Sequence, residues 1–458
     1  MNMSNKSTNP KGTKDYGPSE LLSIRFIINK IRKVFISFGY SEIETPSIEK
    51  RATLYEKYGD EGDKFIFNII NSGEKVKKAD IESLSAGKLN QFVSSISEKG
   101  LRFDLTVPLA RFVAQHFNKI NFPFKRFQIQ KVWRSDRPQR GRFQEFTQCD
   151  VDAIGSNSIL LEYEMIQIYS KVFRELGLKD VKIKINHRQI LNSIANKIGI
   201  SDSFNEFIVL IDKRDKIGSE KLRNLLRNDL NIKDSHIDYL FELFGYSGKF
   251  SDLINKITNE FSDALSTKAA EEINKIYEMM ENSDELVEIE FDLSLARGLN
   301  YYTGIIYEVV APDSNIGSLG GGGRYSDLTK SFGVDNLPGI GISFGLERIH
   351  LLMDEKNLFP ELKVLSNDIL IINFDINFIN EIKNIIDGLR SHGRNVFVYP
   401  DSTKVSKQFS FADKNNFNFV IIYGQEEKDG DNIKIRSMDN GVERLFKLKN
   451  FIKEFSKM

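Results

Sequence analysis

The stretch WRSDRPQRGRFQEFTQCDVD, from Trp133 to Asp152, predicts an arginine-rich hairpin that returns into a strand. Four arginines surround its turn: Arg134, Arg137, Arg140 and Arg142. Guanidinium groups bind phosphate oxygens through two parallel hydrogen bonds and stay charged at neutral pH. This segment therefore predicts a phosphate-binding hairpin. A solvated, salt-bridged hairpin is the alternative, because most surface charges only face water.

Polar side chains alternate along the strands on both sides of this turn. Gln130 and Arg134 share one face of the first strand, and Gln148, Asp150 and Asp152 share one face of the second. A half-buried strand normally carries apolar residues on its inner face. Because buried polar groups need partners, this pattern predicts a face that binds a nucleoside triphosphate and a small cationic or polar ligand.

Two glycine-containing segments further along the chain add candidate ligand contacts. LARGLNYYTGIIYEV, from Leu295 to Val309, includes Arg297 and runs into a β-branched and aromatic strand. GSLGGGGRYSDL, from Gly317 to Leu328, predicts a glycine loop that lacks the ending of a P-loop. A flexible surface turn is the alternative, but Arg324 and Tyr325 after the glycines favour a loop that closes over a ligand.

Composition restricts the class of protein. The 458 residues predict about three domains. Net charge is zero, so any nucleic-acid binding must come from local patches. The single cysteine, Cys149, excludes disulfides and thiolate clusters within the chain, and the five scattered histidines lack metal-ligand spacing, so no protein-held metal is expected. A polar N-terminus and the lack of a long apolar run predict a cytoplasmic protein without membrane spans.

Hydrophobic periodicity predicts an α+β protein. A helix is expected at 21–38, ended by Gly39, and an extended segment with Pro46 at 41–50. The other expected elements are a strand at 65–70, a loop or hairpin excursion at 73–99, a strand-to-helix passage at 101–116, a helix at 159–177, mainly helical sequence at 190–282, strands at 286–310, and strand, glycine and helix at 338–353.

From residue 368 the pattern changes to alternating strands and helices, which predicts a small α/β domain with a parallel or mixed sheet. Its expected elements are 369–374, 376–391, 396–399, 405–414 and 417–423. The expected divisions of the whole chain are a strand-rich core at 1–188 and 286–358, a helical insertion at 189–285 and the α/β domain at 366–458.

Several segments together resemble the histidyl-tRNA synthetases, a family of class II aminoacyl-tRNA synthetases. GYSEIETPSIEK resembles motif 1 of that class, VWRSDRPQRGRFQEFTQCD motif 2 and GISFGLERI motif 3. RGLNYYTG, GGGGRYSDL and RFDLTVPLAR resemble three histidine-specific segments, PKGTKDYGP the family's opening and KVSKQFSFADK a helix of its anticodon domain. The resemblance implies an antiparallel-sheet class II catalytic domain with a helical insertion, followed by a small α/β anticodon-binding domain.

The resemblance also implies a role for each matching residue. The implied ATP contacts are Arg134, Asp136, Arg142, Phe146 and Arg348; the implied histidine contacts are Asp104, Thr106, Gln148, Asp152, Tyr301 and Tyr302. Arg297, against the α-phosphate, and Arg134 are the expected catalytic residues. Arg137 and Gln139 are expected at the tRNA acceptor end, Gly322, Gly323, Arg324 and Tyr325 in a substrate loop, and Pro46 at a dimer interface. Asp136 stands where many class II enzymes have glutamate.

The activity implied by the resemblance is a histidine–tRNA ligase that uses ATP, with Mg²⁺ carried on the ATP phosphates, and acts on L-histidine and tRNA(His) as a homodimer. A non-catalytic regulatory subunit that binds histidine is the alternative. Paralogues of that kind generally lack the anticodon domain and lose motif arginines, whereas Arg134, Arg142, Arg297 and Arg348 are all present here. A synthetase for another amino acid is less consistent with the paired histidine-specific segments.

Overall fold

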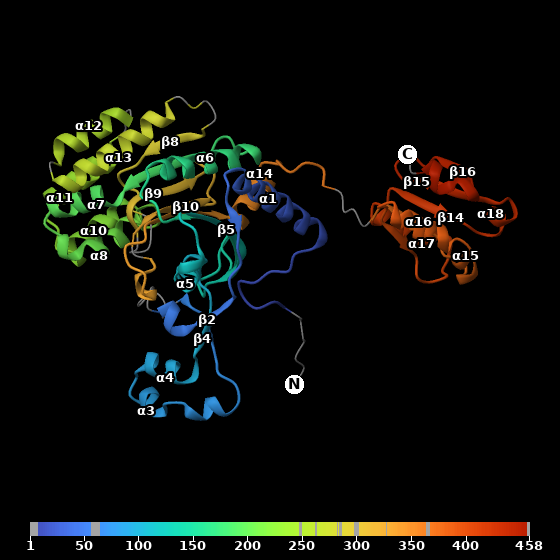
Figure 1. Ribbon diagram of the computed structural model, residues 1–458, viewed down its shortest axis with the longest axis horizontal. Coiled ribbons are helices and arrows are strands. Elements are labelled where there is room, and N and C mark those ends of the chain that lie inside the picture. The colour runs from blue at the N-terminus through green and yellow to red at the C-terminus, as the bar shows by residue number, and fades with distance from the viewer. Residues whose placement is uncertain are drawn as a thin grey trace. The chain divides into compact units, whose positions relative to one another are not determined.

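The computed structural model describes residues 8–55, 65–246, 250–261, 263–281, 283, 286–296, 302–326, 328–362 and 367–455. The chain divides into two compact units, Met1–Pro360 and Glu361–Met458 (Figure 1). Each unit has its own sheet and its own core. The α+β class expected from the sequence is confirmed, and no helix in the described ranges is long and apolar enough to cross a membrane.

A mostly antiparallel eight-stranded sheet forms the centre of the first unit, in the order β1-β5-β6-β11-β10-β9-β7-β8. Only the pairs β1·β5 and β7·β8 run parallel. The strands are β1 (Ser41–Glu42), β5 (Phe124–Trp133), β6 (Glu145–Ile154), β7 (Lys182–His187), β8 (Glu288–Phe291), β9 (Tyr302–Val310), β10 (Gly320–Tyr325) and β11 (Gly339–Gly345). The hairpin expected from the Trp133–Asp152 segment is the β5–β6 pair, whose strands are ten residues each.

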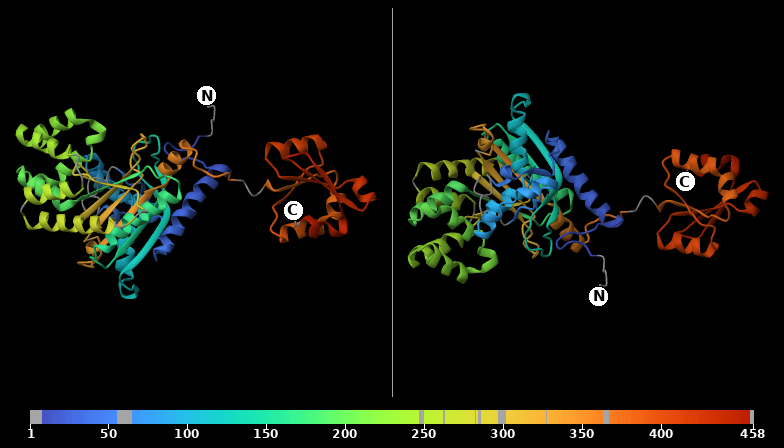
Figure 2. Two further views of the ribbon diagram at one scale, coloured as in Figure 1. Left: turned by 90° about the horizontal axis from the view of Figure 1, so that it is seen from above. Right: turned by 90° about the horizontal axis from the view of Figure 1, so that it is seen from below.

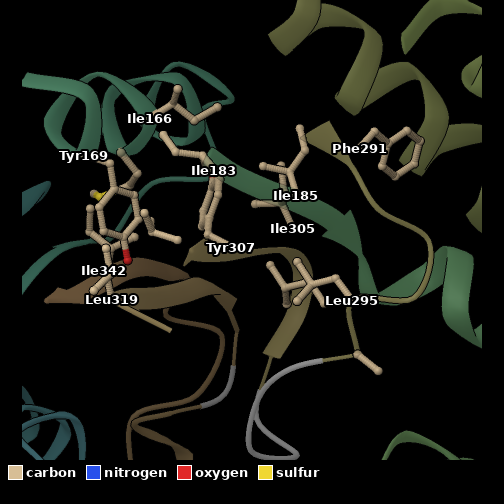
Figure 3. Close-up of a cluster of buried hydrophobic side chains, with 14 of the residues drawn as sticks. Ile166, Tyr169, Ile183, Ile185, Phe291, Leu295, Ile305, Tyr307, Leu319 and Ile342 are labelled. Atoms are coloured by element: carbon tan, nitrogen blue, oxygen red, sulfur yellow. The ribbon is translucent and has the colours of Figure 1, made fainter. Parts of the chain in front are cut away.

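One face of this sheet is buried under helices. The helices are α1 (Pro18–Ser37), α6 (Leu160–Glu175) and α14 (Leu346–Glu355), and they pack on one another and on β6 and β11. The β6 residues Cys149, Val151 and Ala153 are fully buried in this core. Figure 3 shows how α6, β7, β9 and β11 contribute to it, with Ile166, Ile183, Tyr307 and Ile342 among the side chains that meet there. The opposite face of β5 and β6 is therefore the one that remains for a ligand.

The helix expected at 21–38 forms as α1, because its apolar residues repeat at helical spacing. Its buried stripe consists of Ile24, Ile27, Ile31, Val34 and Phe35. Gly39 adopts a left-handed conformation, with φ of +80°, directly after the helix. The expected passage into a helix after residue 101 also forms, as β4 (Lys99–Leu101) and α5 (Thr106–Gln115), with Pro108 in the first turn.

The expected helical segment between the strand-rich parts forms seven helices within the described ranges. They are α7 (Arg188–Lys197), α8 (Phe204–Ile211), α9 (Arg214–Ile217), α10 (Ser219–Asp229), α11 (Asp234–Phe244), α12 (Phe250–Glu260) and α13 (Ala264–Met280). Figure 2 shows them gathered at one side of the sheet. They belong to the first compact unit and share its hydrophobic core, with α7 packing on β9 and α13 on α6.

The prediction of a loop or hairpin excursion at 73–99 was wrong. This segment contains the 3₁₀ helix η1 (Gly73–Lys78) and the short helices α3 (Ile81–Ser85) and α4 (Leu89–Ile96). Asp80 caps α3 by accepting a hydrogen bond from the Ser83 backbone N–H at 2.9 Å. Sequence reasoning missed a signal here, because Leu89, Phe92, Val93 and Ile96 of α4 repeat at helical spacing. Beside them lies a small antiparallel sheet, β2 (Ile48–Lys50), β4 and β3 (Asn68–Ile69), so the strand expected at 65–70 is shorter than predicted.

The glycine loop expected at 317–328 was also wrong, because Gly320–Tyr325 is strand β10 in the interior of the sheet. A Cβ atom on Gly322 would lie 2.1 Å from the Gly341 carbonyl oxygen, and one on Gly323 would lie 2.5 Å from that of Ile305. Glycine is needed here because neighbouring backbones approach too closely for any side chain. The four glycines therefore belong to a tightly packed strand.

The second unit is a five-stranded mixed sheet, in the order β13-β12-β14-β15-β16, with helices on both faces. Its elements are β12 (Ile369–Ile371), α15 (Ile376–Glu381), α16 (Lys383–Ser391), β13 (Val396–Val398), α17 (Val405–Lys414), β14 (Phe419–Ile422), α18 (Gln425–Asp429), β15 (Asn432–Ser437), β16 (Glu443–Lys447) and α19 (Phe451–Phe455). The expected alternation and the mixed sheet are confirmed. The helix expected at 376–391 is interrupted at Ile382, and the β15–β16 hairpin was not predicted.

Candidate active site

The arginine hairpin extends from the edge of the ligand face, and Arg134 is held at its base. The Arg134 Nε atom donates a hydrogen bond to the Phe103 carbonyl at 3.0 Å. Its guanidinium lies 4.3 Å from the centre of the Phe103 ring and 5.2 Å from that of Phe146. Contact with two aromatic rings fixes the direction of a flexible side chain. Arg134 and Phe146, both expected at an ATP site, are thus brought together.

Asp136 and Arg142 form an ion pair across the hairpin. The Arg142 Nη2 and Nε atoms donate to Asp136 Oδ2 at 2.6 and 3.2 Å. These two residues line a cleft of about 600 Å³ together with Phe65, Arg137, Pro138 and Gln139. Arg137 and Gln139 are exposed at the hairpin tip, where Gln139 and Arg142 form a β-bridge. The cleft therefore combines cationic groups with an exposed tip that can contact a second, larger ligand.

Arg348, from the first turn of α14, lies beside the hairpin although it is about two hundred residues away in sequence. Its Nη1 atom donates to the Ser318 carbonyl at 2.7 Å. A Cβ atom on Gly141 would lie 3.3 Å from the Arg348 Cγ atom. The positive φ of Gly141, +68°, and this close approach both favour glycine at the hairpin tip. The arginine hairpin and the start of α14, both expected to bind ATP, are therefore in contact.

Six polar side chains face one another across β5 and β6, and we call them the polar row: Arg126, Gln128, Gln130, Gln148, Asp150 and Asp152. The register pairs Arg126 with Asp152, Gln128 with Asp150 and Gln130 with Gln148. Four of these residues are buried. Several of their polar atoms have no hydrogen-bond partner among the described residues: Gln128 Oε1, Gln148 Oε1, Asp150 Oδ1 and the guanidinium nitrogens of Arg126. Unpartnered buried polar atoms concentrated on one face indicate a ligand site.

Asp152 is held from two sides. Arg126 Nη2 lies 2.7 Å from Asp152 Oδ2, and the Tyr325 hydroxyl donates to Asp152 Oδ1 at 2.9 Å. A Cβ atom on Gly341 would lie only 2.0 Å from Asp152 Oδ1, so the carboxylate rests against the backbone of β11. Burial raises the pKa of Asp152, while Arg126 and the Tyr325 hydroxyl act in the opposite direction.

Asp150 is the second buried carboxylate of the row. Burial raises its pKa to about 7, with further upward contributions from Asp152 and Asp104, whereas Arg126 and the Ser343 hydroxyl lower it. The charges of Asp104, Asp150 and Asp152 therefore act on one another, and the Arg126 guanidinium offsets them. Such a site favours a ligand that carries positive charge.

Asp104 and Thr106 lie where α5 begins. Asp104 is buried, and its Oδ1 atom accepts hydrogen bonds from the backbone N–H groups of Thr106 and Val107 at 3.0 and 3.1 Å. Its influence on both aspartates of β6 places its charge near the polar row. One carboxylate oxygen of Asp104 is thus used to begin the helix.

Arg324 and Tyr325 do not lie in a loop, so that part of the expectation was wrong, while their contact with substrate stays a prediction. Both are buried in β10, as are the preceding glycines Gly322 and Gly323, although Gly321 is only partly buried. Arg324 donates to both oxygens of Glu162 in α6 at 2.6 Å and to the Ser156 carbonyl at 2.6 Å. Its role in the structure is therefore to join the sheet to the start of α6. Tyr325 does face the site, but as a partner of Asp152 in a strand.

Tyr302 is the first residue of β9 and pairs with Tyr325 in the β9–β10 ladder. Arg297 and Tyr301, expected against the α-phosphate and the histidine side chain, lie outside the described residues. Pro46 is exposed between β1 and β2.

Sequence reasoning missed Arg126 and Gln128. Both alternate with Gln130 along β5, so the same two-residue period that identified Gln148, Asp150 and Asp152 could have found them. It also missed Ser343 of β11, whose hydroxyl accepts a hydrogen bond from Gln148 Nε2 at 3.3 Å. Within the described ranges, no group of three or more His, Cys, Asp or Glu side chains could hold a metal ion.

An antiparallel sheet that carries an arginine hairpin and a polar strand face is the arrangement of a class II aminoacyl-tRNA synthetase. The sequence model described as Histidyl-tRNA synthetase matches residues 79–349, and the one described as Anticodon binding domain matches residues 368–458. The chain belongs to the histidyl-tRNA synthetase family.

Individual relatives agree with this family. A histidine–tRNA ligase of Christiangramia forsetii is 45% identical over 442 residues, which cover 96% of this chain and 97% of the relative. The crystal structure of histidyl-tRNA synthetase from Nostoc sp. PCC 7120 has a TM-score of 0.76 at 25% identity, covering 99% of both chains. A structure from Bacillus halodurans C, described as an ATP phosphoribosyltransferase regulatory subunit/histidyl-tRNA synthetase, has a TM-score of 0.70 at 21% identity, covering 91% of this chain and 98% of that one.

At 21% identity, the similarity to the Bacillus halodurans structure shows only that the two chains share a fold. The near-full-length identity to ligases is the finding that separates this chain from the regulatory alternative.

Proposed function

We propose that this chain activates L-histidine with ATP and transfers it to tRNA(His). The observation that carries the proposal is that one strand pair, β5–β6, bears both groups the reaction needs. The polar row suits a small cationic amino acid, and the arginine hairpin beside it suits the phosphates of ATP.

The histidine contacts in this proposal are Asp104, Thr106, Gln148 and Asp152, together with the tyrosines of the RGLNYYTG segment. Asp104 and Thr106 would meet the α-ammonium group, the two tyrosines would meet the imidazole region, and Gln148 and Asp152 would line the pocket, where the Asp152 carboxylate is available to the imidazole. An acceptor such as Asp152 favours a ligand with a ring N–H, and a buried acceptor left unpaired penalises an apolar analogue. The unpartnered oxygens of the polar row support this assignment.

The ATP contacts in this proposal are Arg134, Asp136, Arg142, Phe146 and Arg348. Planar guanidinium groups suit phosphate oxygens, and the ring of Phe146 suits a base. Mg²⁺ would accompany the ATP through its phosphates. Arg297 enters the proposal from the family motif alone, as the residue against the α-phosphate.

The proposed chemistry needs no protein nucleophile. The histidine carboxylate attacks the α-phosphorus of ATP, an oxygen–phosphorus bond forms, and pyrophosphate leaves. The hydroxyl of the 3′-terminal adenosine of tRNA then attacks the carbonyl carbon of the adenylate, and AMP leaves. The protein contributes by positioning the reactants and by stabilising the charge that spreads over the phosphoryl oxygens. Arg134 and Arg297 are the proposed catalytic residues.

The proposed tRNA contacts are divided between the two units. Arg137 and Gln139, exposed at the hairpin tip, would meet the acceptor end, and the second unit would bind the anticodon. A cytoplasmic homodimer completes the proposal. The exposed Pro46 and the neighbouring Ile48, whose exposed fraction is 50%, support an interface at this edge.

The test is amino-acid-dependent exchange between ATP and radiolabelled pyrophosphate, without tRNA. We expect L-histidine to support exchange. Saturable histidine binding without any exchange would contradict the proposal and favour the regulatory alternative.

A further inference from the structure

The buried Arg126 lies at one end of the polar row, and nothing in the family motifs accounts for it. Its side chain has no exposed surface, and that of Asp152 is 6% exposed. Arg126 Nη2 lies 2.7 Å from Asp152 Oδ2, but no N–H of the guanidinium makes a well-directed hydrogen bond to any described residue. Burying a guanidinium with so few partners costs considerable free energy, so a purely structural explanation is weak.

The surroundings of Asp152 explain what this arginine can do. Tyr325 binds the other carboxylate oxygen, and Gly341 leaves the space in which the carboxylate lies. The ion pair with Arg126 on one oxygen and the hydrogen bond from Tyr325 on the other restrict the rotation of the carboxylate. A carboxylate has about four lone-pair sites, so it keeps capacity to accept a hydrogen bond from a ligand.

We propose that Arg126 is a positioning residue for histidine recognition: it fixes the orientation and the negative charge of Asp152 so that this carboxylate can accept the N–H of the substrate imidazole. The inference rests on the proposed function, because it takes histidine as the occupant of the polar row. Arg126 acts through Asp152 and does not touch the reacting atoms.

The charge of Arg126 affects the pKa of Asp152, so the proposed positioning role should show in the pH dependence of histidine binding. The charged and titratable groups around Asp152 are Arg126 on β5, Asp150 on β6, Tyr325 on β10 and Asp104 before α5. Burial raises the pKa of Asp152, and Arg126 is the first of the groups that oppose this rise. Without Arg126, the Asp152 carboxyl therefore holds its proton to higher pH, and a protonated carboxyl accepts the imidazole N–H poorly.

The experiment measures the KM for histidine in pyrophosphate exchange, and the Kd for histidine by equilibrium dialysis, from pH 6.5 to 9 in wild type and variants. We expect Arg126→Gln to raise both constants about 10- to 100-fold near neutral pH, which is the effect of losing a hydrogen bond to a charged group. The ratio of the variant's Kd or KM for histidine to the wild-type value should fall as pH rises, because Asp152 loses its proton again at higher pH and can accept the imidazole N–H. Taking this ratio cancels the titration of free histidine. The KM for ATP should be unchanged.

The matched control is Lys125→Gln. Lys125 is the neighbouring residue on β5, and its ion pair with Glu164, at 2.9 Å, lies on the opposite face of the strand. This variant should keep the wild-type KM for histidine at every pH. Arg126→Lys keeps the charge without the planar fork, so it should recover part of the affinity.

If Arg126→Gln does not fold, Arg126→Lys and Tyr325→Phe are measured instead. Arg126→Lys, which keeps the charge, should raise the Kd for histidine with a weaker dependence on pH, and Tyr325→Phe, which removes the other group that lowers the pKa of Asp152, should raise it with the same trend as Arg126→Gln. A wild-type Kd, or a ratio that does not change with pH, would overturn the proposal. Dialysis also separates the two hypotheses, because wild-type protein that binds histidine without exchange contradicts the proposed function alone.

Discussion

Arg324→Met should destabilise the first unit strongly while leaving histidine recognition nearly intact. Arg324 and Glu162 are 8% and 4% exposed, and the guanidinium makes two hydrogen bonds to the carboxylate and one to the Ser156 carbonyl. Removing one partner of a buried ion pair leaves the other charge uncompensated, which costs about 3–5 kcal/mol. That is a large part of the stability of about 5–15 kcal/mol that is usual for a folded protein.

The assay is urea unfolding followed by tryptophan fluorescence. Trp133 is the single tryptophan of the chain and lies in β5, so its signal reports on the first unit. The control is Arg227→Met, which removes an equally short ion pair to Asp234, at 2.6 Å, on the surface. An exposed pair of this kind contributes at most about 1 kcal/mol. Unchanged stability of Arg324→Met together with a raised KM for histidine would refute the structural role and favour a direct role of Arg324 in histidine binding.

Four further predictions concern the site and the domains. Gly341→Ala should raise the KM for histidine more than that for ATP in exchange assays, because the added Cβ meets Asp152 at 2.0 Å. Gln139→Ala should weaken tRNA charging more than exchange, since this residue is exposed at the hairpin tip; equal losses would place it in the ATP site. A chain ending at Pro360 should keep exchange but charge tRNA poorly, and full charging by a folded truncated protein would contradict this division. Asp150, with its pKa raised to about 7, should make the free energy of unfolding fall between about pH 4 and pH 7, and Asp150→Asn should remove most of that slope in urea titrations.

Asp150 binds its proton more tightly in the folded protein than in the unfolded chain. The folded protein holds a proton on Asp150 up to about pH 7, because burial raises its pKa, whereas the unfolded chain releases it near the ordinary aspartate pKa of 3.8. Between these two pKa values the folded state binds more protons than the unfolded state. The stabilising contribution of Asp150 is therefore complete below the unfolded pKa and is lost as pH rises through the folded pKa.

Local periodicity was sufficient to predict the elements that are long and amphipathic. Helix α1 and the β5–β6 pair each place apolar residues on one face, and each formed where expected. The expected ATP-site residues Arg134, Phe146 and Arg348 came together around the hairpin. Their positions depend on strand pairing and helix packing, which the family motifs already imply.

Tertiary contacts explain what the sequence did not reveal. Four consecutive glycines suggest a loop, yet Gly322 and Gly323 lie in a central strand because adjacent backbones leave no room for a Cβ. Arg324 resembled a ligand contact because its partner, Glu162, lies far away in the sequence. Helix α3 has only five residues, too few to show a period, whereas the eight residues of α4 do carry apolar side chains at helical spacing that the sequence reading missed.

The most direct test of the central claim is tRNA charging by the purified full-length protein, with unfractionated tRNA, ATP, Mg²⁺ and each of the twenty amino acids in turn. Sequencing of the acylated tRNA identifies the acceptor. We predict that L-histidine alone is attached, that tRNA(His) alone accepts it, and that Asp152→Ala abolishes charging at low histidine concentration. Charging with a different amino acid, or histidine binding without any charging, would contradict the assignment of the polar row to histidine in an ATP-dependent ligase.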